Sequence, residues 1–288
     1  MTRIAVLTPD PADKSYIGRW PEVLARLKTT LETTGAEITP TPWTDHVEDA
    51  SGLEGHDLIL PVIAWGYHRD HARWLKACAT WATAGLPIAN PASVLGWNSD
   101  KTYLARLADK GVPIPPTRWS EAITQDQVDA AFAETGAPTL IIKPTVSAGA
   151  FRTLRLTPGQ PLTEAPEGPA MIQPYLKSIE TEGETSLLFF GGRFSHAVNK
   201  RPVPGDFRIQ IQFGGLYTTV TPDAAAFALA EQVLAAVEEP LLYARIDLAR
   251  DDAGAWVLME AELIEPDFYL DHDPANGSGF AEAVRNRL

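Results

Sequence analysis

The chain has 288 residues, of which 45% are hydrophobic, and this is enough to bury one large core or several packed lobes. It carries 37 acidic and 24 basic residues, a formal net charge of −13, so its surface repels nucleic-acid phosphates and anionic lipids. Its one cysteine, Cys78, excludes an internal disulfide. We therefore expect no nucleic-acid partner, no membrane partner and a cytoplasmic location.

The segment 1–96 alternates strand and helix patterns. A short apolar run at residues 4–8 is followed at once by polar and proline residues, which predicts a first strand and not a signal peptide. Further strands are predicted at 37–41, 58–64 and 86–89, and helices at 21–34 and 68–84. This alternation favours a small, mainly parallel sheet in an N-terminal α/β domain.

Two further units complete a mixed α/β (α+β) chain. The segment 97–176 predicts helices at 100–110 and 126–135 and strands at 117–119, 139–143 and 170–173. The segment 177–288 is antiparallel in character, because the glycine turn Gly191-Gly192 joins two apolar strands. Its predicted elements are a helix at 224–237 and strands at 184–190, 193–199, 207–213, 243–249 and 256–262.

Two lysines occupy positions where a charge needs a partner. Lys101 begins a predicted helix directly after Asn98-Ser99-Asp100, and Lys143 ends the apolar strand Leu140-Ile141-Ile142. A lysine at the end of a buried strand must have its charge neutralised, and a phosphate oxygen would do so. The alternative is that each lysine is solvated or forms an ordinary salt bridge.

The loop after Lys143 consists of small residues, Thr145-Val146-Ser147-Ala148-Gly149-Ala150. Small residues allow backbone N–H groups to approach an anion, and Ser147 adds a hydroxyl donor. The chain contains neither GxxxxGK[ST] nor GxGxxG, so this loop is not a P-loop or a dinucleotide-binding turn. Most glycine loops are plain turns, but the position directly after a strand lysine favours phosphate binding.

Three acids on two successive strands predict a metal site. Glu260 and Glu262 are two residues apart, so they point to one face of their strand. Asp247 lies on the preceding strand and faces the same side if the connecting loop is even in length. Carboxylate oxygens are ligands that Mg²⁺ prefers. The alternative is a solvated sheet face, which the apolar neighbours disfavour: Leu258, Met259, Leu263 and Ile264.

Two cations add to this set. Lys200 ends a predicted strand, and Arg208 follows Pro204-Gly205-Asp206 at the start of another. Arginine can bind a phosphate or a carboxylate through two parallel hydrogen bonds.

In their order and spacing these motifs resemble the ATP-grasp superfamily, on its glutathione-synthetase-like side. The resemblance extends over residues 98–266. It rests on Asn98-Ser99-Asp100-Lys101, Ile142-Lys143-Pro144, Gln173-Pro174-Tyr175-Leu176, the acidic run at 180–186, Gly205-Asp206-Phe207-Arg208 with Gly214-Gly215, Arg245-Ile246-Asp247 and Glu260-Ala261-Glu262.

This resemblance implies an ATP-grasp fold in which a central lobe, 97–176, and a C-terminal lobe, 177–288, clamp Mg²⁺-ATP. It implies that Lys101, Lys143, Ser147 and Gly149 bind the phosphates, Gln173, Pro174, Tyr175 and Leu176 bind adenine, and Glu184 binds the ribose. Lys200 would lie near the nucleotide, and Arg208, with Lys143 and Lys200, would act in catalysis. Asp247, Glu260 and Glu262 would bind magnesium. Many relatives have Asn at the position of Glu262, so this chain brings an extra negative charge.

A narrower resemblance, to the cycloserine-synthetase type of O-ureidoserine cyclo-ligases, rests on four segments: Gly183-Glu184, Phe194-Ser195-His196-Ala197-Val198, Gly205-Asp206-Phe207-Arg208 and Leu263-Ile264-Glu265-Pro266. It implies a ligase of antibiotic biosynthesis that activates a small amino-acid-like substrate by phosphoryl transfer, so that an internal nitrogen closes a ring. Expected substrate contacts, each of which could equally be structural, are Tyr16, His196, Glu265 and Asn276. A homodimer stays open by analogy with relatives.

Three alternatives stay open at this point. An intermolecular carboxylate–amine ligase would have the same motifs. A nucleotide-binding module without catalysis would keep the fold, although the retained acids and Arg208 disfavour it. A metallohydrolase would use His68, Asp70 and His71, or Asp271, His272 and Asp273, but no further ligand spacing supports a zinc site.

Overall fold

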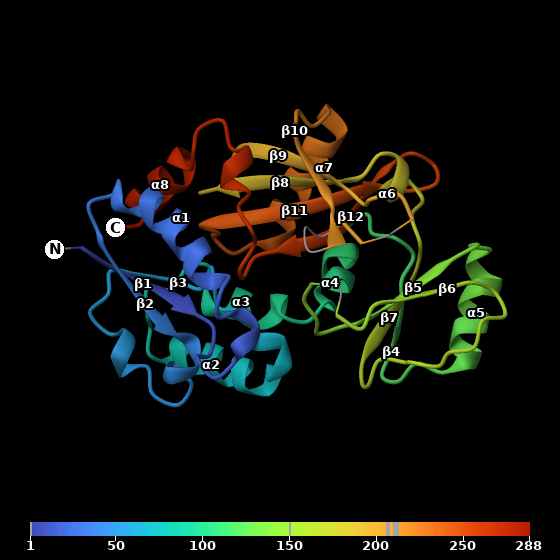
Figure 1. Cartoon of the computed structure of the whole chain (residues 1–288), viewed down its shortest axis with the longest axis horizontal. Helices are drawn as coiled ribbons and strands as arrows, with labels where there is room; N and C mark the ends of the chain where they lie inside the picture. Colours follow the sequence, from blue (N-terminus) through green and yellow to red (C-terminus); the bar gives the residue numbers. More distant parts are fainter. Residues whose placement is uncertain (1, 150, 206–207, 210–212) are drawn as a thin grey trace.

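The protein is described by a computed structural model that covers residues 2–149, 151–205, 208–209 and 213–288. Its elements form three units (Figure 1). The N-terminal unit and the central unit lie at opposite ends of the molecule, and the C-terminal sheet extends across both. Among the described residues no helix is both long and apolar enough to cross a membrane.

The N-terminal unit is a parallel sheet of three strands with a helix on each face. Its strands are β1 (Arg3–Thr8), β2 (Glu37–Pro42) and β3 (Leu58–Leu60), in the order β2-β1-β3. Helix α1 (Trp20–Glu32) covers the face that carries Ile4 and Val6, and α2 (His71–Thr83) covers the face that carries Ala5 and Leu7. The predicted parallel sheet is confirmed. The strand predicted at 86–89 is reduced to one bridge between Ile88 and Ile59, because Pro87 has no N–H to donate to a ladder.

The central unit is an antiparallel sheet covered by one helix. The strand order is β4 (Arg118–Ser120), β7 (Ala170–Pro174), β5 (Leu140–Pro144) and β6 (Leu154–Leu156), and α5 (Gln125–Thr135) packs on it. Thr124 and Gln127 form a capping box that fixes the start of α5. Strand β6 was not among the predicted elements.

The helix predicted at 100–110 is present but shorter, because it begins at Tyr103 and ends at Asp109. The structure has α3 (Ala92–Asn98) and α4 (Tyr103–Asp109), and Lys101 lies in the turn between them. The backbone N–H of Lys101 donates to the carbonyl of Thr145 at 2.8 Å. This bond holds Lys101 against the segment after β5 and keeps it in the turn before α4.

The C-terminal unit is an antiparallel sheet of five strands. Their order is β10 (Leu216–Val220), β9 (Arg193–Arg201), β8 (Glu184–Phe190), β11 (Tyr243–Arg250) and β12 (Trp256–Glu262). The predicted hairpin and the helix α7 (Ala224–Val237) are confirmed. The strand predicted at 207–213 falls mainly outside the described residues. The short α6 (Ser178–Thr181), β10 and the amphipathic α8 (Ser278–Arg285) were not predicted.

The two faces of the C-terminal sheet differ. On one face, α7 packs Val233 against Ile246 and Leu248. The opposite face is apolar where the N-terminal unit packs on it, through residues such as Phe190 and Tyr243. Beyond this contact the same face carries charged side chains that line a cleft: Glu184, Lys200, Arg245, Asp247, Glu260 and Glu262.

A β-bulge in β12 produces this division of faces. Asp247 pairs with Glu260, but the next residue, Leu248, pairs with Leu258, so Met259 is the extra residue. Leu258 therefore packs in the core under α7, while Glu260 turns to the cleft. Without this extra residue, the two-residue period would place Leu258 and Glu260 on one face.

Two buried asparagines join the α3 region to the C-terminal sheet. The amide nitrogen of Asn90 donates to the carbonyls of Tyr243 (3.0 Å) and Leu263 (2.7 Å), and its oxygen accepts from the N–H of Leu242 (2.7 Å). Asn98 donates to the carbonyl of Ala261 at 2.9 Å in the same way. These side chains pair with buried backbone groups in and beside β11 and β12.

Replacing Asn90 by alanine should destabilise the protein by about 3 kcal/mol, because buried backbone groups of Leu242 and Leu263 lose their partners. Urea unfolding measures this change. Asn286→Ala, at the exposed end of α8, is the control and should change the unfolding free energy by less than about 0.5 kcal/mol. Equal effects of the two substitutions would contradict the role given to Asn90.

Candidate active site

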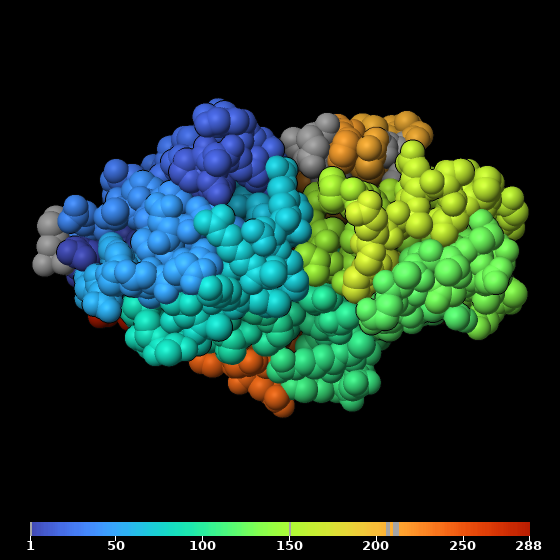
Figure 2. All heavy atoms as spheres, turned by 90° about the horizontal axis from the view of Figure 1, so that it is seen from below, coloured from blue at the N-terminus to red at the C-terminus, as the bar shows by residue number. Residues whose placement is uncertain are grey.

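A cavity of about 670 Å³ lies where the three units meet. Figure 2 shows the N-terminal unit, in blue and cyan, beside the central unit, in green to yellow. The N-terminal unit contributes Tyr16, Trp65 and His68, the central unit contributes Lys101 and Lys143, and the C-terminal sheet contributes the charged face described above. This cleft is large enough for a nucleotide and a small second ligand.

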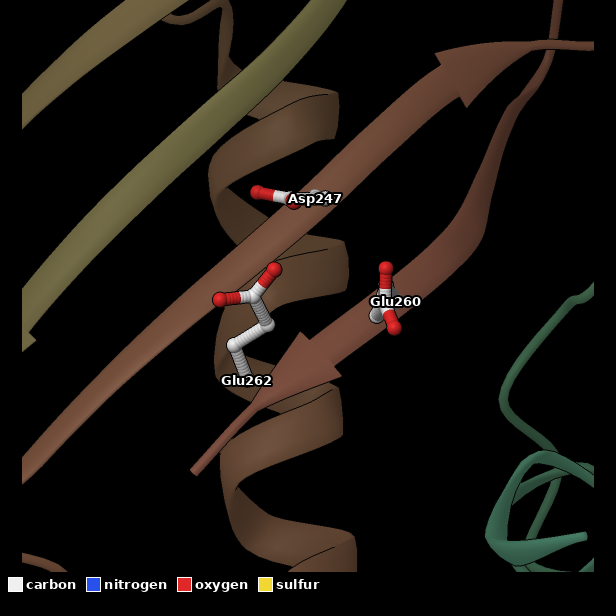
Figure 3. A group of neighbouring side chains, drawn as sticks. All are labelled: Asp247, Glu260 and Glu262. Atoms are coloured by element: carbon white, nitrogen blue, oxygen red, sulfur yellow. The ribbon is translucent and has the colours of Figure 1, made fainter. Parts of the chain in front are cut away.

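Three carboxylates converge on the floor of the cleft. Asp247 stands opposite Glu260 on adjacent strands, and Glu262 is two residues further along β12. One oxygen of each lies within 4.8 Å of the others. Figure 3 shows the three side chains on one side of the two strands, with α7 crossing behind them. Three oxygen donors of this kind fit a hard divalent cation such as Mg²⁺.

Two buried cations already neutralise part of this acidic cluster. Arg245 binds Asp247 at 2.9 Å and also binds Glu262, and Lys200 binds Asp247 at 3.1 Å and Glu184 at 2.7 Å. The hydroxyl of Ser186 donates to Asp247 at 2.6 Å. Burial alone would raise the pKa of Asp247, but Arg245 and Lys200 outweigh it and hold that pKa below its usual value.

Glu262 carries the excess negative charge of the cluster. Burial first, and then the nearby Glu260 and Asp247, raise the pKa of Glu262 to about 8 despite its contact with Arg245. A divalent cation would stabilise the ionised form of this group. The donor set therefore fits a metal better than it fits an empty solvated face.

The two predicted lysines reach the same cleft. Lys101 binds Glu260 at 2.8 Å and donates to the carbonyl of Ser147 at 3.1 Å. Burial would lower the pKa of Lys101, but Glu260 raises it above its ordinary value. Lys143 has no carboxylate partner among the described residues, and burial together with the positive charge of Lys101 lowers its pKa. An anionic ligand would compensate Lys143.

The segment after Lys143 follows the wall of the cleft. Ser147 is buried, its hydroxyl donates to the carbonyl of Pro144 at 3.3 Å, and Ala148 and Gly149 line the cavity. Gly149 has φ +61°, a conformation that favours glycine.

The predicted adenine hinge also lines the cavity, through Gln173, Pro174, Tyr175 and Leu176. The amide of Gln173 donates to Thr117 at 2.9 Å, and the N–H of Tyr175 donates to the carbonyl of Thr139. The side chain of Gln173 therefore fixes the hinge to the strand region before β4.

Arg208 lines the cleft too, and its guanidinium lies 3.7 Å from the ring centre of Phe213. Two residues of the motif that precedes it, Asp206 and Phe207, lie outside the described residues.

The four predicted substrate contacts divide into two pairs. Tyr16 and Glu265 line the cleft. His196 does not: it is buried, and its ring nitrogens bond to the carbonyl of Phe268 and the hydroxyl of Ser195, both at 2.9 Å. Asn276 is exposed in the turn before α8, away from the residues that line the cavity. The structure thus places both residues outside the cleft: hydrogen bonds within the C-terminal unit hold His196, and Asn276 faces solvent.

Two cleft residues received no role from the sequence. Arg245 lies two positions before Asp247 on β11, so the period of a strand alone predicts that both face the cleft. His68 was considered only as a metal ligand, but it lines the cleft, and its buried Nδ1 has no hydrogen-bond partner among the described residues. Burial, with Arg69 and Lys101, lowers the pKa of His68 to about 4, so the ring is neutral.

The histidine-based metal sites are not formed. Asp70 caps α2 by accepting from the N–H of Arg73, and His71 bonds to Ser99 at 2.8 Å. Within the described ranges, the group of side chains that could share an ion is Asp247, Glu260 and Glu262.

Known proteins share both this fold and this sequence pattern. The chain is 28% identical over 275 residues to the cycloserine biosynthesis protein DcsG of Streptomyces lavendulae. The aligned region covers 89% of this chain and 90% of that protein. It is 26% identical over 216 residues to the glutathione synthetase of Prochlorococcus marinus strain MIT 9313. This aligned region covers 71% of this chain and 65% of that protein. No protein-family model matches the chain.

Solved structures agree with these relatives. The D-cycloserine synthetase DcsG superposes with a TM-score of 0.81, at 24% identity and 99% coverage of both chains. The D-alanine–D-alanine ligase of Bacillus anthracis complexed with ATP gives a TM-score of 0.71, at 18% identity, covering 100% of this chain and 99% of that chain. The chain thus has the fold of ATP-grasp ligases. In sequence it is similar, over most of its length, to the cycloserine biosynthesis protein DcsG.

The substitution Lys200→Met should destabilise the protein by about 3–5 kcal/mol, because the buried carboxylates of Glu184 and Asp247 lose the cation that they share. The free energy of unfolding in urea measures the effect. Lys76→Met is the matched control: its ion pair with Glu48 is exposed, with side chains 55% and 72% accessible, and its loss should cost less than about 1 kcal/mol. A Lys200 variant as stable as the control would contradict this view of the cluster.

Proposed function

We propose that the protein is an ATP- and Mg²⁺-dependent ligase that closes a ring on a small amino-acid-derived substrate of the O-ureidoserine type. The convergence of Lys101 and Lys143 with Asp247, Glu260 and Glu262 in one cleft carries the proposal of an ATP site. The similarity to DcsG over nearly the full length of both chains favours ring closure.

Residues from different units have different roles in the proposed site. Bound Mg²⁺-ATP would supply a phosphoryl group that converts an oxygen of the substrate's carbonyl group into a leaving group. Asp247, Glu260 and Glu262 would hold the metal ion. Lys101 and Lys143 would bind phosphate oxygens, with backbone groups around Ser147 and Gly149. The residues from Gln173 to Leu176 would hold adenine, and Glu184 the ribose.

The buried cations would act on developing negative charge. Arg245 is fixed by two carboxylates, so its guanidinium is held in place before any ligand arrives. Such preorganised cations stabilise charge without the cost of reorientation. We assign Arg208 the same task beside the reacting group, and Lys200 the task of holding Glu184 and Asp247 in position. The units 1–96, 97–176 and 177–288 would then serve as substrate wall, phosphate lobe and metal lobe.

Incubation with ATP, Mg²⁺ and O-ureidoserine, followed by ADP measurement and mass spectrometry, tests the proposal. We expect ADP release that depends on the substrate, together with a cyclic product. If the protein instead forms a linear amide from a panel of free amino acids, it is an intermolecular ligase and ring closure is wrong. If it binds the nucleotide but releases no ADP with any member of the panel, it is a binding module without catalysis.

Lys143→Met should weaken ATP binding about 10- to 100-fold, because a charge-assisted bond to phosphate is lost. Calorimetric titration with a non-hydrolysable ATP analogue measures it. Lys28→Met, on the exposed face of α1, removes the same charge and should leave the affinity unchanged. An unaltered affinity in the Lys143 variant would remove this lysine from the nucleotide site.

Asp247→Asn and Glu260→Gln should each raise the Mg²⁺ concentration needed for half-maximal ADP release by at least about tenfold, because each removes an anionic oxygen ligand. Titration of free Mg²⁺ at saturating ATP measures the shift. Asp252→Asn, in the exposed turn between β11 and β12, should have no effect. If both variants kept the wild-type magnesium dependence, the metal site would lie elsewhere.

A further inference from the structure

The acidic side chains that line the cleft are nearly all paired within the protein. Glu184 and Asp247 bind Lys200, Glu260 binds Lys101, and Glu262 binds Arg245. Each of these carboxylates therefore has a built-in cation before any ligand is present.

Glu265 is the exception among the described, half-buried acids of the cleft. It follows β12, between the buried residues Ile264 and Pro266, and its side chain lines the cavity. In the described part of the chain, no cation and no other side chain bonds to its carboxylate, and its own backbone N–H is the one hydrogen-bond donor recorded for it. Burial raises the pKa of Glu265 to about 7. Asp267, the remaining acid, is exposed and accepts from the N–H of Tyr269.

The cations that act on Glu265, Arg245 and Lys101, are already engaged, and so is Arg69 beside Tyr16. Arg69 binds Asp13 at 2.7 Å and lies over the ring of Tyr16, 5.0 Å from its centre. Lys101 and Arg245 bind the acidic cluster. Burial raises the pKa of Tyr16, Arg69 opposes this, and the carboxylates of Asp13 and Glu265 raise the pKa further. Glu265 therefore acts electrostatically on the side of the cleft that the N-terminal unit forms. The protein therefore leaves this carboxylate for a ligand to neutralise.

A metal ion is not the ligand that this position fits. The side chains that can share an ion are Asp247, Glu260 and Glu262, and Glu265 is not one of the group in the part of the chain that the structure describes. An organic cation needs one carboxylate, and burial of that carboxylate strengthens the pair. Lys143, which has no carboxylate partner in the part of the chain that the structure describes, shows the complementary case of a cation that suits a phosphate.

We propose that Glu265 binds the cationic amino group of the substrate, so that the enzyme selects amino-acid-derived substrates whose amino group is free. This inference rests on the proposed function and adds a specificity-determining residue to it. A buried carboxylate left without a cation is costly, and a substrate that brings the cation recovers that cost. A substrate whose amino group is absent or acylated brings none.

A two-by-two comparison tests this inference. Wild-type protein and Glu265→Gln are each titrated with O-ureidoserine and with its des-amino analogue, in the presence of Mg²⁺ and a non-hydrolysable ATP analogue. For the wild type, loss of the amino group should weaken binding about 10- to 100-fold, the range for a hydrogen-bonded charge pair. Glu265→Gln should weaken binding of O-ureidoserine by a similar factor and leave binding of the des-amino analogue unchanged.

Two further variants complete the experiment. Glu231→Gln removes one negative charge from an exposed position on α7 and should bind both probes like the wild type. Glu265→Asp keeps the charge and should restore part of the preference for the free amino group. If Glu265→Gln does not fold, the wild type and Glu265→Asp still decide the question by their preference between the probes.

The remaining outcomes overturn the inference in distinguishable ways. Equal weakening of both probes in Glu265→Gln would mean a structural role, and no weakening would mean no role. If the ATP analogue binds but the wild type binds neither probe, the inference fails while the nucleotide site stands. If the ATP analogue itself does not bind, the proposed function fails, and the inference fails with it.

Discussion

The structure depends on a network of opposite charges buried on one face of the C-terminal sheet. Asp247 lies at its centre, held by Ser186, Lys200 and Arg245. Buried charges are costly unless they are paired and hydrogen-bonded, so these side chains hold one another in fixed positions. The same pairing leaves the outer carboxylates, Glu260 and Glu262, directed to the cleft, where a metal ion can reach them.

The N-terminal and central units form the sides of the cleft above this charged face. The N-terminal unit covers the apolar end of the same sheet face and is joined to it by Asn90 and Asn98. The turn between α3 and α4 then brings Lys101 to Glu260, and β5 brings Lys143 from the central unit. Charges from three units thus meet in one cavity, although the residues are far apart in the chain. Among the described residues of the cleft, Lys143 and Glu265 are two charges without an ion pair inside the protein, and a ligand can complete each of them.

Much of this could be predicted from the sequence because it depends on local patterns. The strands that contain Glu184, Asp247 and Glu260 were predicted correctly, as were α7 and the glycine hairpin. The helix predicted at 100–110 spans only 103–109, since a bond from Lys101 to Thr145, more than 40 residues away, holds Lys101 in the turn before it. His196, which was predicted as a substrate contact, lies outside the cleft in the structure for a similar reason: its hydrogen-bond partner Phe268 is distant in sequence.

By itself, the sequence determined the residue types: hard oxygen ligands two apart on a strand, lysines beside small-residue turns, and an acidic chain whose ordered motifs resemble ATP-grasp ligases. Only the tertiary structure decided which charges neutralise each other and which stay open to ligands. The bulge at Met259 turns Glu260 to the cleft, and no local pattern reports a one-residue shift between paired strands. Charge pairing is a property of distances in space, and those distances exist only once the three units have packed together.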